Sequence, residues 1–210
     1  AIASNMDRQV SRNKLSPNDK EKALSRIQTT SDLLALKGCD LIIEAATENE
    51  EIKKSIFRAL TPHLKAPTIL ASNTSSISIT ALSAVTDRTD RFIGMHFMNP
   101  VPMMTLVEII RGLGTSEATY NAVEAMVIRL GKQVACSEDY PGFIVNRVLM
   151  PMINEAVKAL HEGVGTIEAI DKGMRLGTNH PMGPFQLADL IGLDTCRSIM
   201  DVLYDGLGSP

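Results

Sequence analysis

The chain alternates short, continuous apolar runs with longer stretches of helical periodicity, and this alternation restricts the fold more than any other feature of the sequence. Runs of strand length that are apolar throughout, as in strands buried on both faces, occur at residues 40–46, 68–72, 91–97, 105–111 and 132–136. Apolar side chains at helical spacing predict helices at residues 2–10, 17–26, 50–64, 77–85 and 117–130. Because strands that alternate with helices form sheets covered on both faces, we predict an α/β fold with a doubly wound, mostly parallel sheet.

The pattern changes after a polar, acidic turn at residues 137–140. From Phe143 onward the chain has helical periodicity almost throughout, and we expect helices at residues 143–160, 166–176, 184–191 and 193–204. A change from alternating strands and helices to helices alone, at a polar turn, is typical of a domain boundary. We therefore predict two domains, with the sheet in residues 1–138 and an all-α domain in residues 139–210.

Charge and cysteine usage exclude several classes of partner. The 210 residues carry a formal net charge of −3 with lysine and arginine scattered, so the chain has no basic patch for nucleic acid. No apolar run reaches the roughly 18 residues of a membrane span, so we expect no membrane partner. Cys39, Cys136 and Cys196 lie far apart without a CxxC motif, which favours buried packing roles in a reducing compartment and predicts no metal site.

Two titratable residues interrupt the predicted strands. His96 lies at the end of a buried run, where side chains emerge into the crevice of an open sheet, although a histidine there is more often structural than catalytic. Glu108 lies within the apolar run 106–110, and a carboxylate in a buried strand needs a donor. If the two strands are neighbours, Glu108 orients one imidazole nitrogen while the other accepts a proton; on an edge strand Glu108 would face solvent. The sequence leaves both alternatives open.

Polar residues also follow the predicted strands. The segment ASNTSS, residues 71–76, comes between a strand and a helix, so its side chains and amides face the same crevice, although helix capping explains part of this composition. Glu44 and Glu48 flank the end of the first strand, and a solvated loop position is the simpler interpretation for each. Asn99 and Asn146 are ordinary turn and helix residues on this reasoning.

Five ordered segments resemble the 3-hydroxyacyl-CoA dehydrogenase family, especially its bacterial 3-hydroxybutyryl-CoA dehydrogenases. They are, in this order, ASNTSSISIT, RFIGMHFMNPVP, LVEIIRG, PGFIVNRVLMPMINEA and NHPMGPFQLADLIGLDT, and the resemblance covers nearly the whole chain. The resemblance implies a Rossmann-type NAD-binding domain and the oxidation of an L-3-hydroxyacyl-CoA to the 3-ketoacyl-CoA, a reaction of fatty-acid β-oxidation. A non-catalytic, crystallin-like relative and a sugar-acid dehydrogenase of the same architecture are the alternatives.

The resemblance also implies roles for particular residues. His96 matches the family's catalytic base and Glu108 the glutamate that orients it. Ser75 matches a serine near the reacting hydroxyl and the nicotinamide, and Asn99 and Asn146 match asparagines that help hold the substrate and the histidine in line.

A second group of matches concerns the cofactor. Glu48 and Lys53, together with Ser75 and Asn99, match family positions near the bound NAD. The partners implied are an acyl-CoA substrate and a second copy of the chain, in a bacterial cytoplasm or a mitochondrial matrix. Apolar side chains on the expected helix 143–160, among them Met150, Met152 and Ile153, favour the homodimer.

One family feature is missing from the sequence. No GxGxxG turn is present, and we expect the sheet to be truncated and to lack strands between those that the chain contains. Without the amides of that turn, we expect the 210 residues by themselves to bind NADH weakly and to be inactive alone. The segment that distinguishes NAD from NADP is absent too, so NADP remains an alternative cofactor.

Overall fold

The computed structural model describes residues 2–208, which divide after residue 37 into two compact units. The first unit contains helices α1 (Ile2–Ser11) and α2 (Pro17–Leu24), joined by an ion pair between Asp7 and Lys20. The Ser16 side chain accepts a hydrogen bond from the Asp19 amide and caps α2, as the Ser-Pro sequence predicts.

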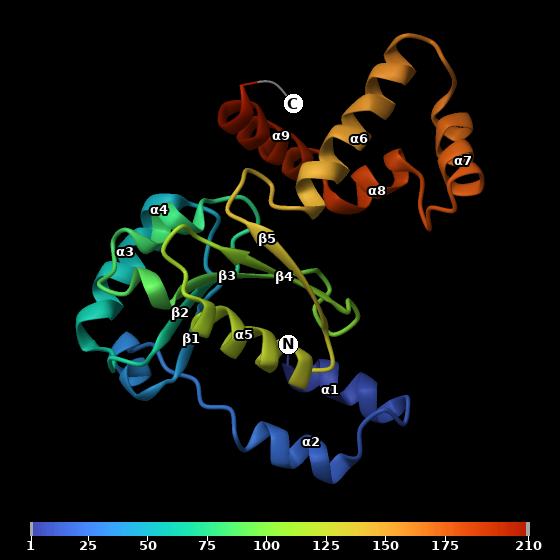
Figure 1. Cartoon of the computed structure of the whole chain (residues 1–210). Coiled ribbons are helices and arrows are strands. Elements are labelled where there is room, and N and C mark those ends of the chain that lie inside the picture. The colour runs from blue at the N-terminus through green and yellow to red at the C-terminus, as the bar shows by residue number, and fades with distance from the viewer. Residues whose placement is uncertain (1, 209–210) are drawn as a thin grey trace. The chain divides into compact units, whose positions relative to one another are not determined.

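The second unit is built on a five-stranded sheet in the order β1-β2-β3-β4-β5 (Figure 1). Its strands are β1 (Leu41–Glu44), β2 (Ile69–Ser72), β3 (Phe92–Phe97), β4 (Leu106–Arg111) and β5 (Gln133–Glu138). All neighbours pair in parallel except β3 and β4, which are antiparallel, so the predicted mostly parallel α/β sheet is confirmed. The expectation of missing strands between these five is wrong, because each strand pairs directly with the next and β1 lies at an edge.

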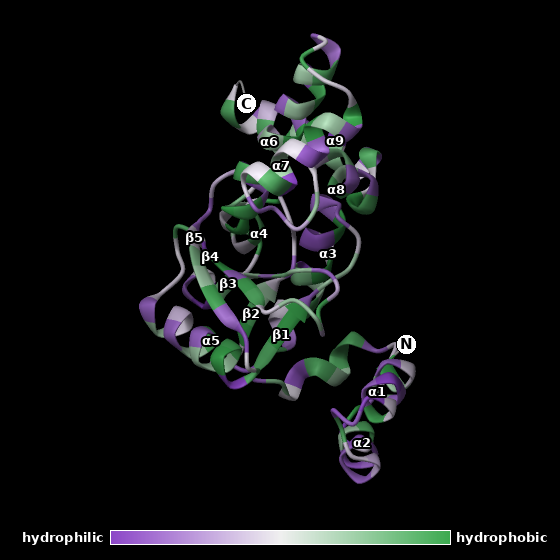
Figure 2. Cartoon of the chain, turned by 90° about the vertical axis from the view of Figure 1, so that its right-hand side faces the viewer, coloured by the Kyte–Doolittle hydropathy of each residue, from purple (hydrophilic) through white to green (hydrophobic). Residues whose placement is uncertain are grey.

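Helices cover both faces of this sheet. Val123 and Val127 of α5 (Glu117–Arg129) pack on one face against a cluster that includes Ile93 and Ile109. On the opposite face, the Phe57 ring of α3 (Glu50–Leu60) contacts the Phe92 ring edge to face, with a centroid distance of 4.8 Å. Helix α4 (Ile79–Ser83) lies on that face as well. Figure 2 shows the largely hydrophobic central strands and the mixed surface of α5.

The C-terminal part of this unit is helical, as predicted, and has a core of its own. It contains α6 (Val145–His161), α7 (Ile167–Gly177), α8 (Pro184–Ile191) and α9 (Leu193–Leu207). Met150 and Ile153 are buried in this core and Met152 packs against it, so these side chains do not form the free apolar face expected for a dimer. Within residues 2–208, no helix is long and apolar enough to cross a membrane.

Several element boundaries differ from the prediction for local reasons. Helix α3 ends at Leu60 and continues as the 3₁₀ turn η2 (Thr61–His63), because Pro62 has no N–H to donate to the preceding turn. Two further 3₁₀ segments, η1 (Leu33–Gly38) and η3 (Thr89–Arg91), were not expected. Of the three cysteines predicted to be buried, Cys136 is exposed on β5.

Candidate active site

Antiparallel pairing of β3 and β4 places His96 directly opposite Glu108. The imidazole Nδ1 lies 2.7 Å from Glu108 Oε2, and the glutamate side chain is fully buried. The structure thus realises the first of the two alternatives that the sequence left open. A carboxylate at this distance holds the proton on Nδ1, which leaves Nε2 as the ring's acceptor.

The other ring nitrogen, Nε2, is not fully buried. Among residues 2–208 it has no hydrogen-bond partner, while no buried side-chain nitrogen or oxygen of these residues lacks one. Nε2 must therefore be reached by solvent, although His96 as a whole is only 9% exposed. A histidine held from behind by a carboxylate, with its other nitrogen open, can accept and return a proton.

The second oxygen of Glu108 binds the start of helix α6. Glu108 Oε1 accepts hydrogen bonds from the amides of Ile144, at 3.0 Å, and Val145, at 2.8 Å. Ile144 is the N-cap residue of α6 and provides no side-chain cap. Phe143, just before it, is buried with φ +52°, and its ring lies edge to face with the His96 ring at a centroid distance of 6.0 Å. The pair is therefore enclosed by the chain that leads into α6.

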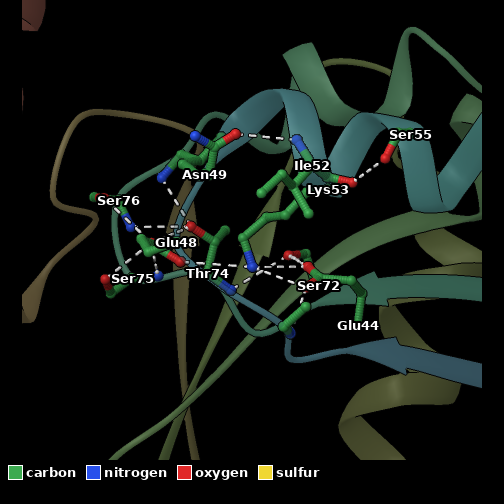
Figure 3. Close-up of polar contacts among 12 residues, drawn as sticks. Glu44, Glu48, Asn49, Ile52, Lys53, Ser55, Ser72, Thr74, Ser75 and Ser76 are labelled. Carbon is green, nitrogen blue, oxygen red and sulfur yellow. Dashed lines mark hydrogen bonds and ion pairs between the residues drawn. The ribbon is translucent and has the colours of Figure 1, made fainter.

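A second polar cluster lies where β1 and β2 end (Figure 3). Glu48 Oε1 accepts hydrogen bonds from the Thr74 hydroxyl at 2.6 Å, from the Ser75 amide at 2.8 Å and from the Ser75 hydroxyl at 3.0 Å. The Ser76 hydroxyl lies 3.3 Å from the same oxygen. Burial alone would raise the pKa of Glu48, but these hydrogen bonds and the charge of Lys53 outweigh it and leave the pKa below its ordinary value. Glu48 is thus held as an anion.

Lys53 and Glu44 form a buried ion pair beneath this cluster. The Lys53 ammonium lies 2.9 Å from both Glu44 oxygens and 3.5 Å from Glu48 Oε2, and the lysine side chain is 1% exposed. The Ser72 hydroxyl and the Ala46 amide also donate to Glu44. Lys53 therefore donates to both Glu44 oxygens and forms an ion pair with Glu48, so its charge is neutralised inside the protein.

The two remaining predicted residues, Asn146 and Asn99, differ in their surroundings. Asn146 Nδ2 donates to the Ser75 carbonyl at 3.2 Å, which links α6 to the turn after β2. Asn99 is exposed in the loop after β3, and no hydrogen bond joins its side chain to the other candidates within residues 2–208. The structure thus brings together Ser75, Glu48 and Asn146, and separately His96 and Glu108.

An open cavity of about 510 Å³ adjoins the Glu48 cluster. Glu48, Ser75 and Ser76 line one side and α9 the other, whereas His96 is not among its lining residues. Glu50 and Asp194 add two further carboxylates, and no lysine or arginine lines it. This cavity fits an uncharged or cationic group better than a phosphate.

Sequence reasoning missed three residues of the site. Glu44, for which a solvated loop position was the simpler interpretation, is buried at the end of β1. The alternation of the strand could have indicated its burial, because Glu44 shares a face with the buried Ile42. Asn73 ties the turn after β2 to β3 by accepting from the Phe97 amide at 3.0 Å. Phe143 gave no signal beyond the preceding Pro-Gly pair.

Comparisons with known proteins identify the chain. Residues 1–140 match the model of the 3-hydroxyacyl-CoA dehydrogenase NAD-binding domain, and residues 142–210 match that of the family's C-terminal domain. The 3-hydroxybutyryl-CoA dehydrogenase of Bradyrhizobium diazoefficiens is 60% identical over 206 residues, covering 98% of this chain and 70% of that protein. The enzyme of the same name from Clostridioides difficile is 48% identical, covering 97% of this chain and 73% of that protein.

A solved structure gives the same result. The crystal structure of (S)-3-hydroxybutyryl-CoA dehydrogenase from Ralstonia eutropha superposes with a TM-score of 0.97 at 53% identity, covering 99% of this chain and 74% of that one. Sequence and fold agree, and the chain belongs to the 3-hydroxyacyl-CoA dehydrogenase family.

Proposed function

We propose that this chain catalyses the NAD-dependent oxidation of an L-3-hydroxyacyl-CoA of short chain length, such as 3-hydroxybutyryl-CoA, to the 3-ketoacyl-CoA. The observation that carries the proposal is the His96 imidazole, with Nδ1 bound to the buried Glu108 and Nε2 open to solvent. Family membership and the names of the relatives supply the substrate class.

His96 acts as the general base in this proposal. The substrate hydroxyl gives its proton to Nε2, the C–H bond at the same carbon breaks, and its electron pair leaves as hydride while the carbonyl forms. Hydride acceptance is the chemistry that NAD supplies when bound. The Glu108 carboxylate, 2.7 Å from Nδ1, stabilises the imidazolium that forms, and it returns the ring to the same tautomer afterwards.

Ser75, Asn146 and Asn99 are proposed to hold the substrate against His96. The Asn146 amide group donates to the Ser75 carbonyl, so its own oxygen remains free to accept from a substrate hydroxyl. The Ser75 hydroxyl lines the open cavity. Asn99 is exposed in the loop that follows His96 and can contact substrate and cofactor from that side.

Glu48 and Ser75 fit the nicotinamide riboside end of NAD. A carboxylate held as an anion beside the cavity accepts from ribose hydroxyls and favours the cationic, oxidised ring over the neutral, reduced one. The cavity lining has no basic side chain for the pyrophosphate, so we propose that these 210 residues alone bind NADH weakly. We further propose that Lys53, which is buried and paired with Glu44 and Glu48, acts on the cofactor through Glu48.

The test is a comparison of two histidine variants in the protein that contains this chain. His96→Gln should lower kcat for 3-hydroxybutyryl-CoA about 100- to 10,000-fold, while NADH affinity by fluorescence titration stays unchanged. His63→Gln, an exposed residue of η2, serves as the matched control and should keep full activity. Equal turnover of His96→Gln would refute the assignment. Activity of the wild-type protein on a sugar acid alone would favour a sugar-acid dehydrogenase. Activity on neither substrate would favour a non-catalytic, crystallin-like relative.

We propose that the chain forms a homodimer through its helical part. Strongly exposed apolar side chains in that part include Val164, Leu176, Leu190 and Leu193, which are each more than 60% exposed. Sedimentation velocity at several concentrations should give twice the chain mass, and a monomer at all concentrations would refute the proposal. The three unpaired cysteines support a reducing location, the cytoplasm of a bacterium or the mitochondrial matrix.

A further inference from the structure

Phe143 has a backbone conformation that side-chain-bearing residues rarely adopt. Its φ is +52°, and the preceding Gly142 has φ +75°, so two consecutive residues lie in the left-handed region. At Gly142 a side chain would also come within 2.8 Å of Leu203 and 3.0 Å of the Arg147 amide. Glycine at position 142 tolerates both the positive φ and the close approach of these atoms. Phenylalanine at position 143 does not favour a positive φ, and such a backbone conformation persists only where the surrounding structure imposes it.

The turn at Phe143 delivers two amides to Glu108. The next two residues, Ile144 and Val145, donate their N–H groups to Glu108 Oε1. They are the N-cap and first residue of the 17-residue helix α6, where amides are otherwise unpaired and the helix dipole favours an anion. Glu108 therefore caps α6 with one oxygen and holds His96 with the other.

The Phe143 side chain completes the enclosure of His96. The ring is 4% exposed and meets the imidazole at an interplanar angle of 61°. An edge-to-face contact restricts rotation of the imidazole about its second side-chain torsion and keeps water away from that part of the ring. The open Nε2 is then left as the ring's contact with solvent.

We propose that Phe143 is a positioning residue for the His96–Glu108 pair, whose left-handed backbone brings the α6 amides to Glu108 while its ring fixes the imidazole. The inference rests on the proposed function, because it assigns to Phe143 an effect on the base of that reaction. A residue that acts in this way lowers kcat when it is truncated, with little change in KM. A 1 Å misplacement of a reacting group costs about 100-fold in rate.

The first experiment is kinetic and uses two leucine variants. Phe143→Leu keeps most of the apolar volume but removes the flat ring, and we expect a kcat about 10- to 100-fold below wild type with KM nearly unchanged. Phe92→Leu removes the same ring from a buried edge-to-face pair at the other end of β3, and its kcat should match wild type. Equal kcat values for the two variants would overturn the inference.

The second experiment separates positioning from stability. Phe143→Ala and Phe143→Gly both lack the ring, but glycine adopts a positive φ without strain, so Phe143→Gly should unfold at higher urea than Phe143→Ala. Because both variants lack the ring that fixes the imidazole, we expect kcat to stay at least about 10-fold below wild type in both. Turnover that recovers with stability in Phe143→Gly would show a structural role instead.

A spectroscopic readout makes the test independent of the cofactor. Nitrogen-15 shifts of His96 in the wild-type chain should report one tautomer, with the proton on Nδ1, and Phe143→Ala should give averaged shifts. Unchanged shifts in the variant would overturn the inference. A wild-type protein that shows one tautomer but no activity on 3-hydroxyacyl-CoA would instead contradict the proposed function.

Discussion

The buried pair of Lys53 and Glu44 permits a quantitative prediction of stability. Lys53→Met keeps the aliphatic stem but removes the ammonium, which leaves Glu44, 5% exposed, as an unpaired buried anion. Removing one partner of a buried ion pair costs about 3–5 kcal/mol. For a domain of this size 1 kcal/mol corresponds to about 2–4 °C, so we expect the melting temperature to fall by about 6–20 °C.

Adding Glu44→Gln to this variant should restore part of the loss. The glutamine carbonyl can still accept from the Ala46 amide, and its NH2 group, in place of the other oxygen, can donate to the Ser72 hydroxyl, while the buried charge is removed. We therefore expect the double variant to lose less unfolding free energy than the two single variants lose together, with a coupling free energy of about 1–3 kcal/mol. Lys54→Met is the matched control, because the neighbouring Lys54 pairs with exposed carboxylates and its loss should leave stability nearly unchanged.

Urea unfolding followed by circular dichroism measures these quantities, since the chain has no tryptophan to report by fluorescence. Single losses that add to within about 0.5 kcal/mol in the double variant would refute the reasoning, because independent sites behave in that way. A loss in Lys53→Met as small as that in Lys54→Met would refute it as well. Either result would mean that Lys53 is hydrated and free to bind a ligand directly.

Two further predictions concern Glu48 and two glycines. The folded-state pKa of Glu48 is below its ordinary value of 4.5, so the stability that this group contributes is complete above that value and is lost as the pH falls through the folded pKa. The difference in unfolding free energy between wild type and Glu48→Gln should therefore narrow below about pH 4.5 in acid titrations, and a constant difference would contradict this. Gly94→Ala should cost about 1–3 kcal/mol in urea unfolding, because its Cβ would lie 2.7 Å from Ile110 Cβ in the sheet core. Gly173→Ala, in α7 with no atom within 4 Å, is its control and should stabilise the protein by about 0.5–1 kcal/mol, so equal losses in the two variants would be inconsistent with the packing argument.

The sequence predicts this sheet well because its signals are local. The first four apolar runs each contain a strand within the predicted range, and α2 begins at the predicted Ser-Pro pair. The reversal of β4 relative to β3 could not be predicted in the same way, since the course of the loop between them depends on contacts made far along the chain. One such contact joins Lys132 to the carbonyls of Val101 and Met104 in that loop.

In the candidate site too, the features that depend on contacts between distant segments could not be predicted from the sequence. His96 and Glu108 are 12 positions apart, and whether they meet depends on the register of two strands, which the sequence alone does not determine. Lys53 belongs to a helix that is amphipathic in sequence, and nothing local distinguishes it from a surface lysine such as Lys54. The backbone of Phe143 is determined by the packing around α6 and has no local signal.

The two buried glutamates of the sheet differ in what they can do, and their partners explain why. Glu44 is neutralised by a buried ammonium that donates to both of its oxygens and forms an ion pair with Glu48, so the pair is enclosed within the protein. Glu108 is held by two backbone amides, which cannot titrate, and by an imidazole whose far nitrogen is open. A proton taken at that nitrogen creates a cation beside a carboxylate that is already in place, and no buried group has to move. The partners of the two carboxylates therefore support the proposal that His96 transfers the proton and that the Glu44–Lys53 pair holds Glu48 in position.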